Sequence, residues 1–204
     1  MKRIYNLSLL FLIILLSACN KDRFIYPPSE LMPDTTDLRN GDLIFRKGKS
    51  NLSRIITTLY PGRFSHIGIL YKAGNHWSVI HASEGNDYGE EAKVIITPLS
   101  CFVNNNDAEI IGTARIKCSN NLSEKATQLA LQMARENKAF DTDYNLKDTT
   151  KVYCTELVYV VYKSVGIDLL KTSLSQKPLY LENYLFPEEL WNNSSVQQIK
   201  LKGQ

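Results

Sequence analysis

An apolar helical stretch that starts with a cysteine limits the fold of this chain more than any other feature. In residues 153–166, apolar side chains recur at helical spacing and form one stripe: Cys154, Leu157, Val158, Val161, Tyr162 and Val165. Gly166 supplies a stop signal after the stripe, and the polar residues 147–150 before it are typical of a loop. We therefore expect a buried helix that begins at or just before Cys154.

The first turn of a helix is a favourable place for a reactive thiol. The helix end carries partial positive charge and unpaired N–H groups, and both favour thiolate over thiol. Cys154 is therefore a candidate nucleophile. The alternative is that Cys154 only fills the core, because free cysteine is among the most buried residue types. The presence of a suitable histidine decides between the two.

The N-terminus has the pattern of an export signal. Lys2 and Arg3 precede an apolar run at 7–16, which is too short to span a bilayer as a mature anchor. Small residues then stand directly before Cys19, an arrangement that resembles a bacterial lipobox, in which the chain is cut before the cysteine and the cysteine is lipidated. The alternative is an ordinary secretory signal cut near Ala18.

These features predict three parts. Residues 1–18 are expected to be a signal peptide, and residues 19–38 a lipidated cysteine followed by an extended, proline-containing tether. Residues 39–204 are expected to form one domain, since the chain of 204 residues suits a single core. The acyl chains on Cys19 would hold an exported lipoprotein to the membrane, in the periplasm or at the cell surface.

The charge balance gives no sign of a nucleic-acid partner. The chain has 24 Lys plus Arg and 21 Asp plus Glu, and removal of Lys2 and Arg3 with the signal leaves 22 against 21, a net charge of +1. A nucleic-acid-binding surface would need a dense basic patch. Three cysteines remain after Cys19, an odd number, so at most one disulfide can form, and a Cys101–Cys118 pair stays open.

Hydrophobic periodicity predicts an α+β domain with a central antiparallel sheet and helices packed on it. The expected strands cover residues 43–45, 65–71, 77–82, 93–97, 109–117 and 196–201. The expected helices, besides the one after Cys154, cover residues 50–60, 99–103, 119–137 and 187–191.

Two of the three histidines can meet. His66 starts one predicted strand, His81 lies near the end of the next, and a turn at 73–75 makes these strands a hairpin. One imidazole could then act as base and the other as its orienting partner. His76 lies beside the turn and is expected to be solvated. Either of the other two could also be purely structural.

A zinc site built from His66, His81 and Cys154 is a further alternative. It lacks the short CxxC, HxxxH or HExxH spacing that is typical of such sites.

Four blocks of sequence resemble those of NlpC-type papain-like cysteine hydrolases: residues 41–45, 65–69, 79–82 and 153–158. The cysteine block comes last here, an order that resembles the circularly permuted, YiiX-like branch, as do residues 140–144. The resemblance covers residues 39–166 and implies a circularly permuted papain-like fold.

The resemblance implies a Cys–His–polar triad with Cys154 as nucleophile, His66 as general base and His81 as orienter. In YiiX-like members the third position is often an acid, so Glu84 is a lesser candidate. The backbone N–H of Cys154 is a natural oxyanion donor. Tyr153 and Tyr144 are expected to be pocket walls.

The sequence thus predicts a cysteine hydrolase, an amidase or peptidase that forms an acyl-enzyme and requires no cofactor or metal. The resemblance points to cell-envelope peptides such as peptidoglycan stem peptides. Two alternatives remain. One is a lipid acyl hydrolase or acyltransferase of the lecithin:retinol acyltransferase-like type, and the other is a non-catalytic binding lipoprotein on the same scaffold.

Overall fold

The computed structural model describes residues 29–85, 91–148, 150–171 and 183–203. The predicted signal peptide, Cys19 and the first part of the tether lie outside these residues. Within them, no helix combines the length and the apolar character needed to cross a membrane.

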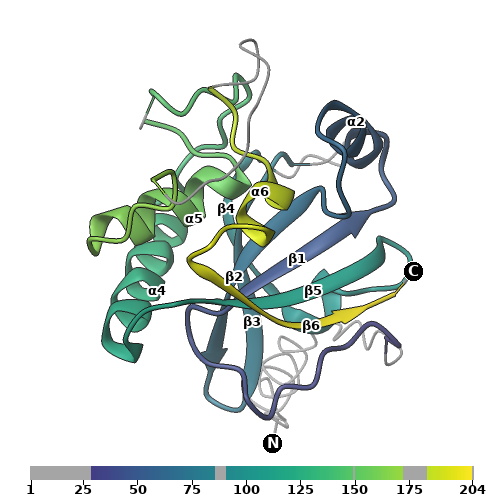
Figure 1. Cartoon of the computed structure of the whole chain (residues 1–204), viewed down its shortest axis with the longest axis horizontal. Helices are drawn as coiled ribbons and strands as arrows, with labels where there is room; N and C mark the ends of the chain where they lie inside the picture. The colour runs from purple at the N-terminus through teal and green to yellow at the C-terminus, as the bar shows by residue number, and fades with distance from the viewer. Residues whose placement is uncertain (1–28, 86–90, 149, 172–182, 204) are drawn as a thin grey trace, which may run out of the picture.

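A six-stranded antiparallel sheet forms the centre of the domain (Figure 1). Its strands stand in the order β4-β3-β2-β1-β5-β6. Their bounds are β1 (Leu43–Gly48), β2 (His66–Ala73), β3 (His76–Ser83), β4 (Lys93–Pro98), β5 (Ala108–Ile116) and β6 (Val196–Lys202). All five strand pairs are antiparallel, as the sequence predicts.

The helices are α2 (Asn51–Leu59), α3 (Leu99–Phe102), α4 (Asn120–Arg135), α5 (Cys154–Ser164) and α6 (Pro187–Trp191). Helices α4 and α5 lie side by side and pack on β2 and β3 (Figure 1). The predicted strands and helices are all present, with boundaries that differ by a few residues, so the predicted α+β class is confirmed.

Each face of the sheet has its own apolar cluster. The larger one lies under α4 and α5 and includes Phe45, Ile67 and Leu157. The smaller one lies on the other face, and it includes Phe102 together with Leu31 and Leu38. Since these two leucines are at most 9% exposed, residues 29–38 pack onto the domain instead of forming an extended tether.

The β2–β3 hairpin forms at the predicted turn. Ala73 pairs with His76, so Gly74 and Asn75 form a two-residue loop, and Gly74 has a φ of +60°. Glycine at the first loop position with positive φ is typical of a tight hairpin turn. This short loop fixes the strand register, which in turn sets which residues of β2 and β3 are neighbours.

The C-terminal segment completes the core. Trp191 of α6 packs its ring on Phe45 and Phe64, with centroid distances of 5.1 and 4.8 Å. Gly112 of β5 leaves room for these rings, because a Cβ there would lie 2.7 Å from both Phe64 and Trp191. The described cysteines Cys101, Cys118 and Cys154 are all free thiols.

Candidate active site

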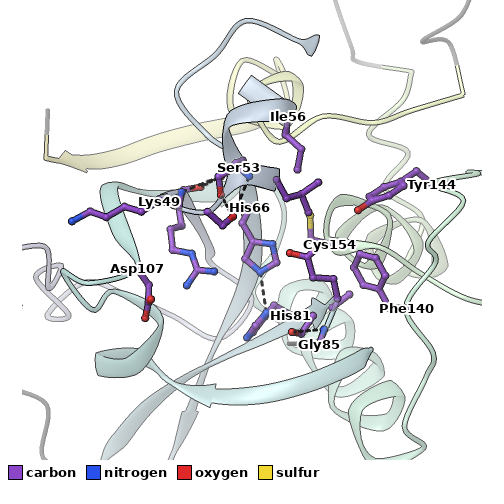
Figure 2. A pocket seen from close by; sticks show the side chains of 18 of the residues that line it. Lys49, Ser53, Ile56, His66, His81, Gly85, Asp107, Phe140, Tyr144 and Cys154 are labelled. Atoms are coloured by element: carbon purple, nitrogen blue, oxygen red, sulfur yellow. Dashed lines mark hydrogen bonds between the residues drawn. The ribbon is translucent and has the colours of Figure 1, made fainter. Parts of the chain in front are cut away.

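Three elements meet where β2 begins, β3 ends and α5 begins. His66 is the first residue of β2, His81 is two residues before the end of β3, and Cys154 is the first residue of α5. All three side chains line one pocket of about 590 Å³ (Figure 2). The structure therefore brings together the three residues to which the resemblance gives catalytic roles.

The two imidazoles form a hydrogen-bonded pair. His66 Nε2 lies 2.9 Å from His81 Nδ1, and His81 Nε2 lies 3.0 Å from the hydroxyl of Thr97 on β4 (Figure 2 draws the first of these bonds). Since Nε2 of His66 is engaged, Nδ1 is the ring nitrogen that remains to accept a proton. We assign a proton to Nε2 of each ring, so that His66 donates to His81 and His81 donates to Thr97.

A glycine lets the histidine pair form. Gly68 lies two residues after His66 on β2, and a Cβ there would come within 3.1 Å of His81 Cβ and 3.0 Å of the Ile80 carbonyl oxygen. Close backbone approach of this kind is a common reason for glycine inside a strand. A Cβ at residue 68 would also meet Val79 Cγ1, so the glycine allows the close approach of the two strands beside the histidine pair.

Phe102 of α3 covers the pair from one side. Its ring lies 5.6 Å from His66, nearly parallel at 28°, and 5.2 Å from His81, edge to face at 74°. Phe102 is fully buried, so it removes water from both imidazoles. The apolar ring thus creates the low-polarity surroundings that set their protonation.

Both imidazoles are neutral at neutral pH. Burial lowers the pKa of His66 well below 6.5, and the neighbouring His81 and Arg46 lower it further. Burial, followed by Arg46, lowers the pKa of His81 to about 3. A neutral His66 can accept a proton, which is what a general base requires.

Cys154 differs from the expectation of a stabilised thiolate. Burial raises the pKa of its thiol to about 11, although hydrogen bonds from the N–H groups of Ile67, Thr155 and Cys154 itself act in the opposite direction. The loss of water around the sulfur thus raises the pKa of the thiol more than the N–H groups at the start of the helix lower it. The resting pair is a neutral thiol beside a neutral imidazole.

The start of α5 is braced by residues far along the chain. The Leu185 N–H donates to the Tyr153 hydroxyl at 2.9 Å, and the Thr155 hydroxyl donates to the Leu185 carbonyl at 2.5 Å. Tyr153 is therefore occupied in the core and, unlike Tyr144, is not among the residues that line the pocket. The expectation that Tyr153 forms a pocket wall is wrong for this reason.

Tyr144 does line the pocket, at the side where Phe140 lies (Figure 2). It has a φ of +52°, a rare backbone conformation for a tyrosine. The buried Asp141 holds this loop by accepting hydrogen bonds from the N–H groups of Asp143 and Asn145. Burial raises the pKa of the Tyr144 hydroxyl to about 12, so it stays neutral and can donate.

Glu84 lines the pocket, whereas His81 is the residue hydrogen-bonded to His66. Both ring nitrogens of His81 have partners, and these are His66 and Thr97. Sequence reasoning missed Thr97, Phe102 and Arg46. The strand pairing that sets Val79 opposite Thr97, and so brings Thr97 near His81, could not be read from the sequence.

The zinc alternative has little geometric support. Among the residues that the structure describes, no group of three or more His, Cys, Asp or Glu side chains is placed to hold a metal ion. The facing nitrogens of His66 and His81 share a hydrogen bond instead of pointing at a common ion.

Comparison with known proteins finds both a family model and similar solved structures. A family model described as "Permuted papain-like amidase enzyme, YaeF/YiiX, C92 family" matches residues 37–199. The fold is similar to a solved structure titled as that of metalloprotein yiiX from Escherichia coli O157:H7, with a TM-score of 0.63 and 20% sequence identity, over 81% of this chain and 98% of that chain. No curated protein matches the chain. The predicted permuted papain-like fold is thereby confirmed.

Proposed function

The chain belongs to the permuted papain-like amidase family of YaeF and YiiX, and from this premise we propose that it hydrolyses amide bonds with Cys154 as nucleophile, His66 as base and His81 as orienting partner. The observation that carries the proposal is the 2.9 Å bond between the two imidazoles in the pocket that Cys154 lines. A nucleophile, a base and a partner for that base are the parts that covalent catalysis needs.

The reaction starts from the neutral pair. As Cys154 Sγ attacks the amide carbon, its proton passes to Nδ1 of His66, and the carbonyl oxygen becomes an oxyanion. The imidazolium that forms on His66 is stabilised by its Nε2–H bond to His81. The backbone N–H of Cys154, at the start of α5, is the proposed oxyanion donor.

The tetrahedral species then breaks down. The C–N bond breaks, the leaving nitrogen takes the proton from His66, and an acyl thioester remains on Cys154. Water attacks this thioester while His66 accepts one of its protons, and the returning proton restores the thiol. The net reaction is amide plus water giving an acid and an amine, and it requires no further reactant.

We propose cell-envelope peptides, such as peptidoglycan stem peptides, as substrates. The predicted signal at 1–18 and the lipobox-like Cys19 support an exported, membrane-anchored lipoprotein that would meet such peptides. The family description supports amide bonds over other acyl groups.

The test is hydrolysis of a stem peptide, L-Ala-γ-D-Glu-diaminopimelate, by the purified protein, with the released amines quantified. We expect turnover that falls at least about 10³-fold in Cys154→Ala and by a similar factor in His66→Gln. His76→Gln, at an exposed position of β3, is the control and should retain full activity. Turnover that survives in Cys154→Ala would refute the mechanism.

A second candidate is hydrolysis of lipid acyl esters with the same triad. Leu52 and Ile56 of α2 line the pocket, and Ile55 and Leu59 of the same helix are each 53% exposed. An apolar helix face beside the pocket suits an acyl chain. Parallel assays with a phospholipid ester and the stem peptide, in one preparation, separate the two candidates by their kcat/KM.

A further inference from the structure

Arg46 is a charged side chain in this pocket that the proposed mechanism does not use. It lies on β1 directly opposite His66 of β2 in the strand register. Directly opposite residues in an antiparallel pair have Cβ atoms about 4.5–5.5 Å apart and point to the same face of the sheet. Arg46 also lines the pocket. Its guanidinium therefore belongs to the immediate surroundings of the proposed base.

The guanidinium is only partly satisfied. Its Nη1 donates to the Phe102 carbonyl at 3.2 Å, and its Cζ lies 4.6 Å from the centre of the Phe102 ring. Its Nε–H is buried and has no hydrogen-bond partner in the part of the chain that the structure describes. A buried donor without a partner is costly to the fold, and such groups are rare unless they serve a purpose.

The carboxylates near Arg46 do not accept a hydrogen bond from its buried Nε–H group. Asp107 and Glu84 line the pocket, and both favour the charged form of Arg46. Both are largely exposed, and neither forms an ion pair with Arg46 among the described residues. The other pocket cation, Lys49, already donates to the Asn105 carbonyl at 2.6 Å. Arg46 is therefore the cation with a free, buried donor beside the histidine pair.

We propose that Arg46 binds a carboxylate of the substrate, so that the preferred peptides carry an acidic group next to the amide that is cut. A guanidinium presents two parallel N–H groups that match a carboxylate. The hydrogen bond from Nη1 to the Phe102 carbonyl and the contact with the Phe102 ring hold the guanidinium of Arg46 in place before the ligand arrives. Because Arg46 lies opposite His66 in the strand register and lines the same pocket as Cys154, the acid would lie close to the scissile amide.

This inference rests on the proposed function only in taking Cys154 as the nucleophile in that pocket. Two alkylating agents test it without any turnover of substrate. Iodoacetamide and iodoacetate react identically with a thiolate: sulfur attacks the CH₂ group, a C–S bond forms, the C–I bond breaks and iodide leaves. They differ only in carrying an amide or a carboxylate. The ratio of their rates at Cys154, at pH 9, therefore reports whether the pocket attracts a carboxylate.

We expect iodoacetate to react with saturation kinetics at Cys154 of the wild-type protein, and its rate relative to iodoacetamide to exceed the ratio for N-acetylcysteine. In Arg46→Gln the ratio should fall about tenfold or more, the size of one lost charge-assisted hydrogen bond. In Arg46→Lys it should fall by less. Lys49→Gln is the matched control, because it removes a pocket cation without the buried Nε–H, and its ratio should change less than threefold.

The outcomes separate the inference from the function. If Cys154 reacts well with both agents and the ratio equals that of N-acetylcysteine, the carboxylate site is refuted and the nucleophile stands. An equal fall of the rate ratio in Arg46→Gln and Lys49→Gln would also refute the carboxylate site, because the general positive charge of the pocket would then explain the preference for iodoacetate. If Cys154 reacts with neither agent up to pH 11, Cys154 is not the nucleophile, and the proposed function is refuted together with this inference.

Matched peptides then identify the source of the carboxylate. Acetyl-Ala-Ala is compared with its C-terminal amide, and acetyl-Glu-amide with acetyl-Gln-amide, as protectors of Cys154 against iodoacetamide. Stronger protection by acetyl-Ala-Ala assigns the site to a chain terminus, and stronger protection by acetyl-Glu-amide assigns it to an acidic side chain. Equal protection within both pairs would overturn the inference.

Discussion

Cys154 and His81 are buried and His66 is partly buried, and the loss of water disfavours the charged form of each side chain. In the proposed mechanism the proton therefore leaves Cys154 during the attack and not before it. The position of Cys154 at the start of α5 could be predicted from the sequence. Its protonation could not, because the loss of water around the sulfur depends on Phe140, Tyr144 and other side chains brought in by the fold.

The first prediction concerns the pH dependence of Cys154 alkylation. Since the thiol pKa is raised to about 11, the iodoacetamide rate at Cys154 should keep rising through pH 9 and 10. A free thiol would level off above its ordinary pKa of about 8.5. Peptide mass spectrometry follows each cysteine separately, and Cys154→Ala identifies the signal. A plateau already reached below pH 7 would mean a preformed thiolate–imidazolium pair and would contradict this account.

The second prediction concerns Thr97, whose hydroxyl accepts from His81. Thr97→Val keeps the shape of the side chain but removes the acceptor, so His81 is held less firmly. We expect kcat for the stem peptide to fall about three- to tenfold, the value of one neutral hydrogen bond, with little change in KM. Thr97→Ser restores the hydroxyl and should restore kcat. If valine and serine behave alike, Thr97 does not position His81.

At the scale of elements, the hairpin and α5 show what the sequence could and could not reveal. Alternation and the glycine turn predict β2 and β3, and with them the meeting of His66 and His81. The contact of residues 183–186 with α5 carries no local signal, because it depends on hydrogen bonds to Tyr153 and Thr155 that span about thirty residues. The same holds for Arg46, whose place beside His66 follows from strand register.

The third prediction belongs to α5 and its buried acid Glu156. The carboxylate accepts from the Tyr153 N–H at 3.3 Å, while its Oε1 is buried without a partner among the described residues. Burial raises the pKa of Glu156 to about 7. The stability gained by keeping the proton is complete below the ordinary pKa of 4.5 and is lost as the pH rises through 7.

As the pH rises from 5 to 8, the free energy of unfolding of Glu156→Gln should therefore rise by about 2 kcal/mol relative to that of wild type. A one-unit pKa difference corresponds to about 1.4 kcal/mol. Urea unfolding at both pH values measures this difference. Glu30→Gln, at an exposed position, is the control and should show none. An equal effect of the two substitutions would contradict the buried-acid interpretation.

In the whole molecule, the permuted order places α5 with Cys154 after the strands that carry His66 and His81, and Leu185 of the C-terminal segment is hydrogen-bonded to the start of α5. Composition and periodicity predict the layers, because each strand and helix has a clear apolar pattern. The packing of residues 29–38 against the sheet was missed, because prolines and scattered charges there resemble a tether while Leu31 and Leu38 are buried.

The fourth prediction is loss of stability in acid. The pKa of both His66 and His81 is lowered by folding, so the unfolded chain binds more protons below pH 6.5, and the free energy of unfolding falls as the pH decreases toward the folded-state values. Glu156 acts in the opposite direction between about pH 4.5 and 7, but two imidazoles outweigh one carboxyl.

Between pH 6 and pH 4, wild type should lose stability more steeply than His81→Gln, by at most about 1.4 kcal/mol per pH unit for the one proton removed. Urea unfolding at several pH values gives the slopes, and His76→Gln, which changes an exposed histidine, should follow wild type. Parallel slopes for His81→Gln and wild type would show that His81 is not buried as a neutral group.

The most direct test of the central claim is the mass of the protein during turnover. Rapid acid quenching of the reaction with the stem peptide, followed by intact and peptide mass spectrometry, looks for an acyl group on the enzyme. We expect a thioester on Cys154 that is absent in Cys154→Ala and reduced in His66→Gln. Turnover with no acyl group on Cys154, or with the acyl group on another residue, would contradict it.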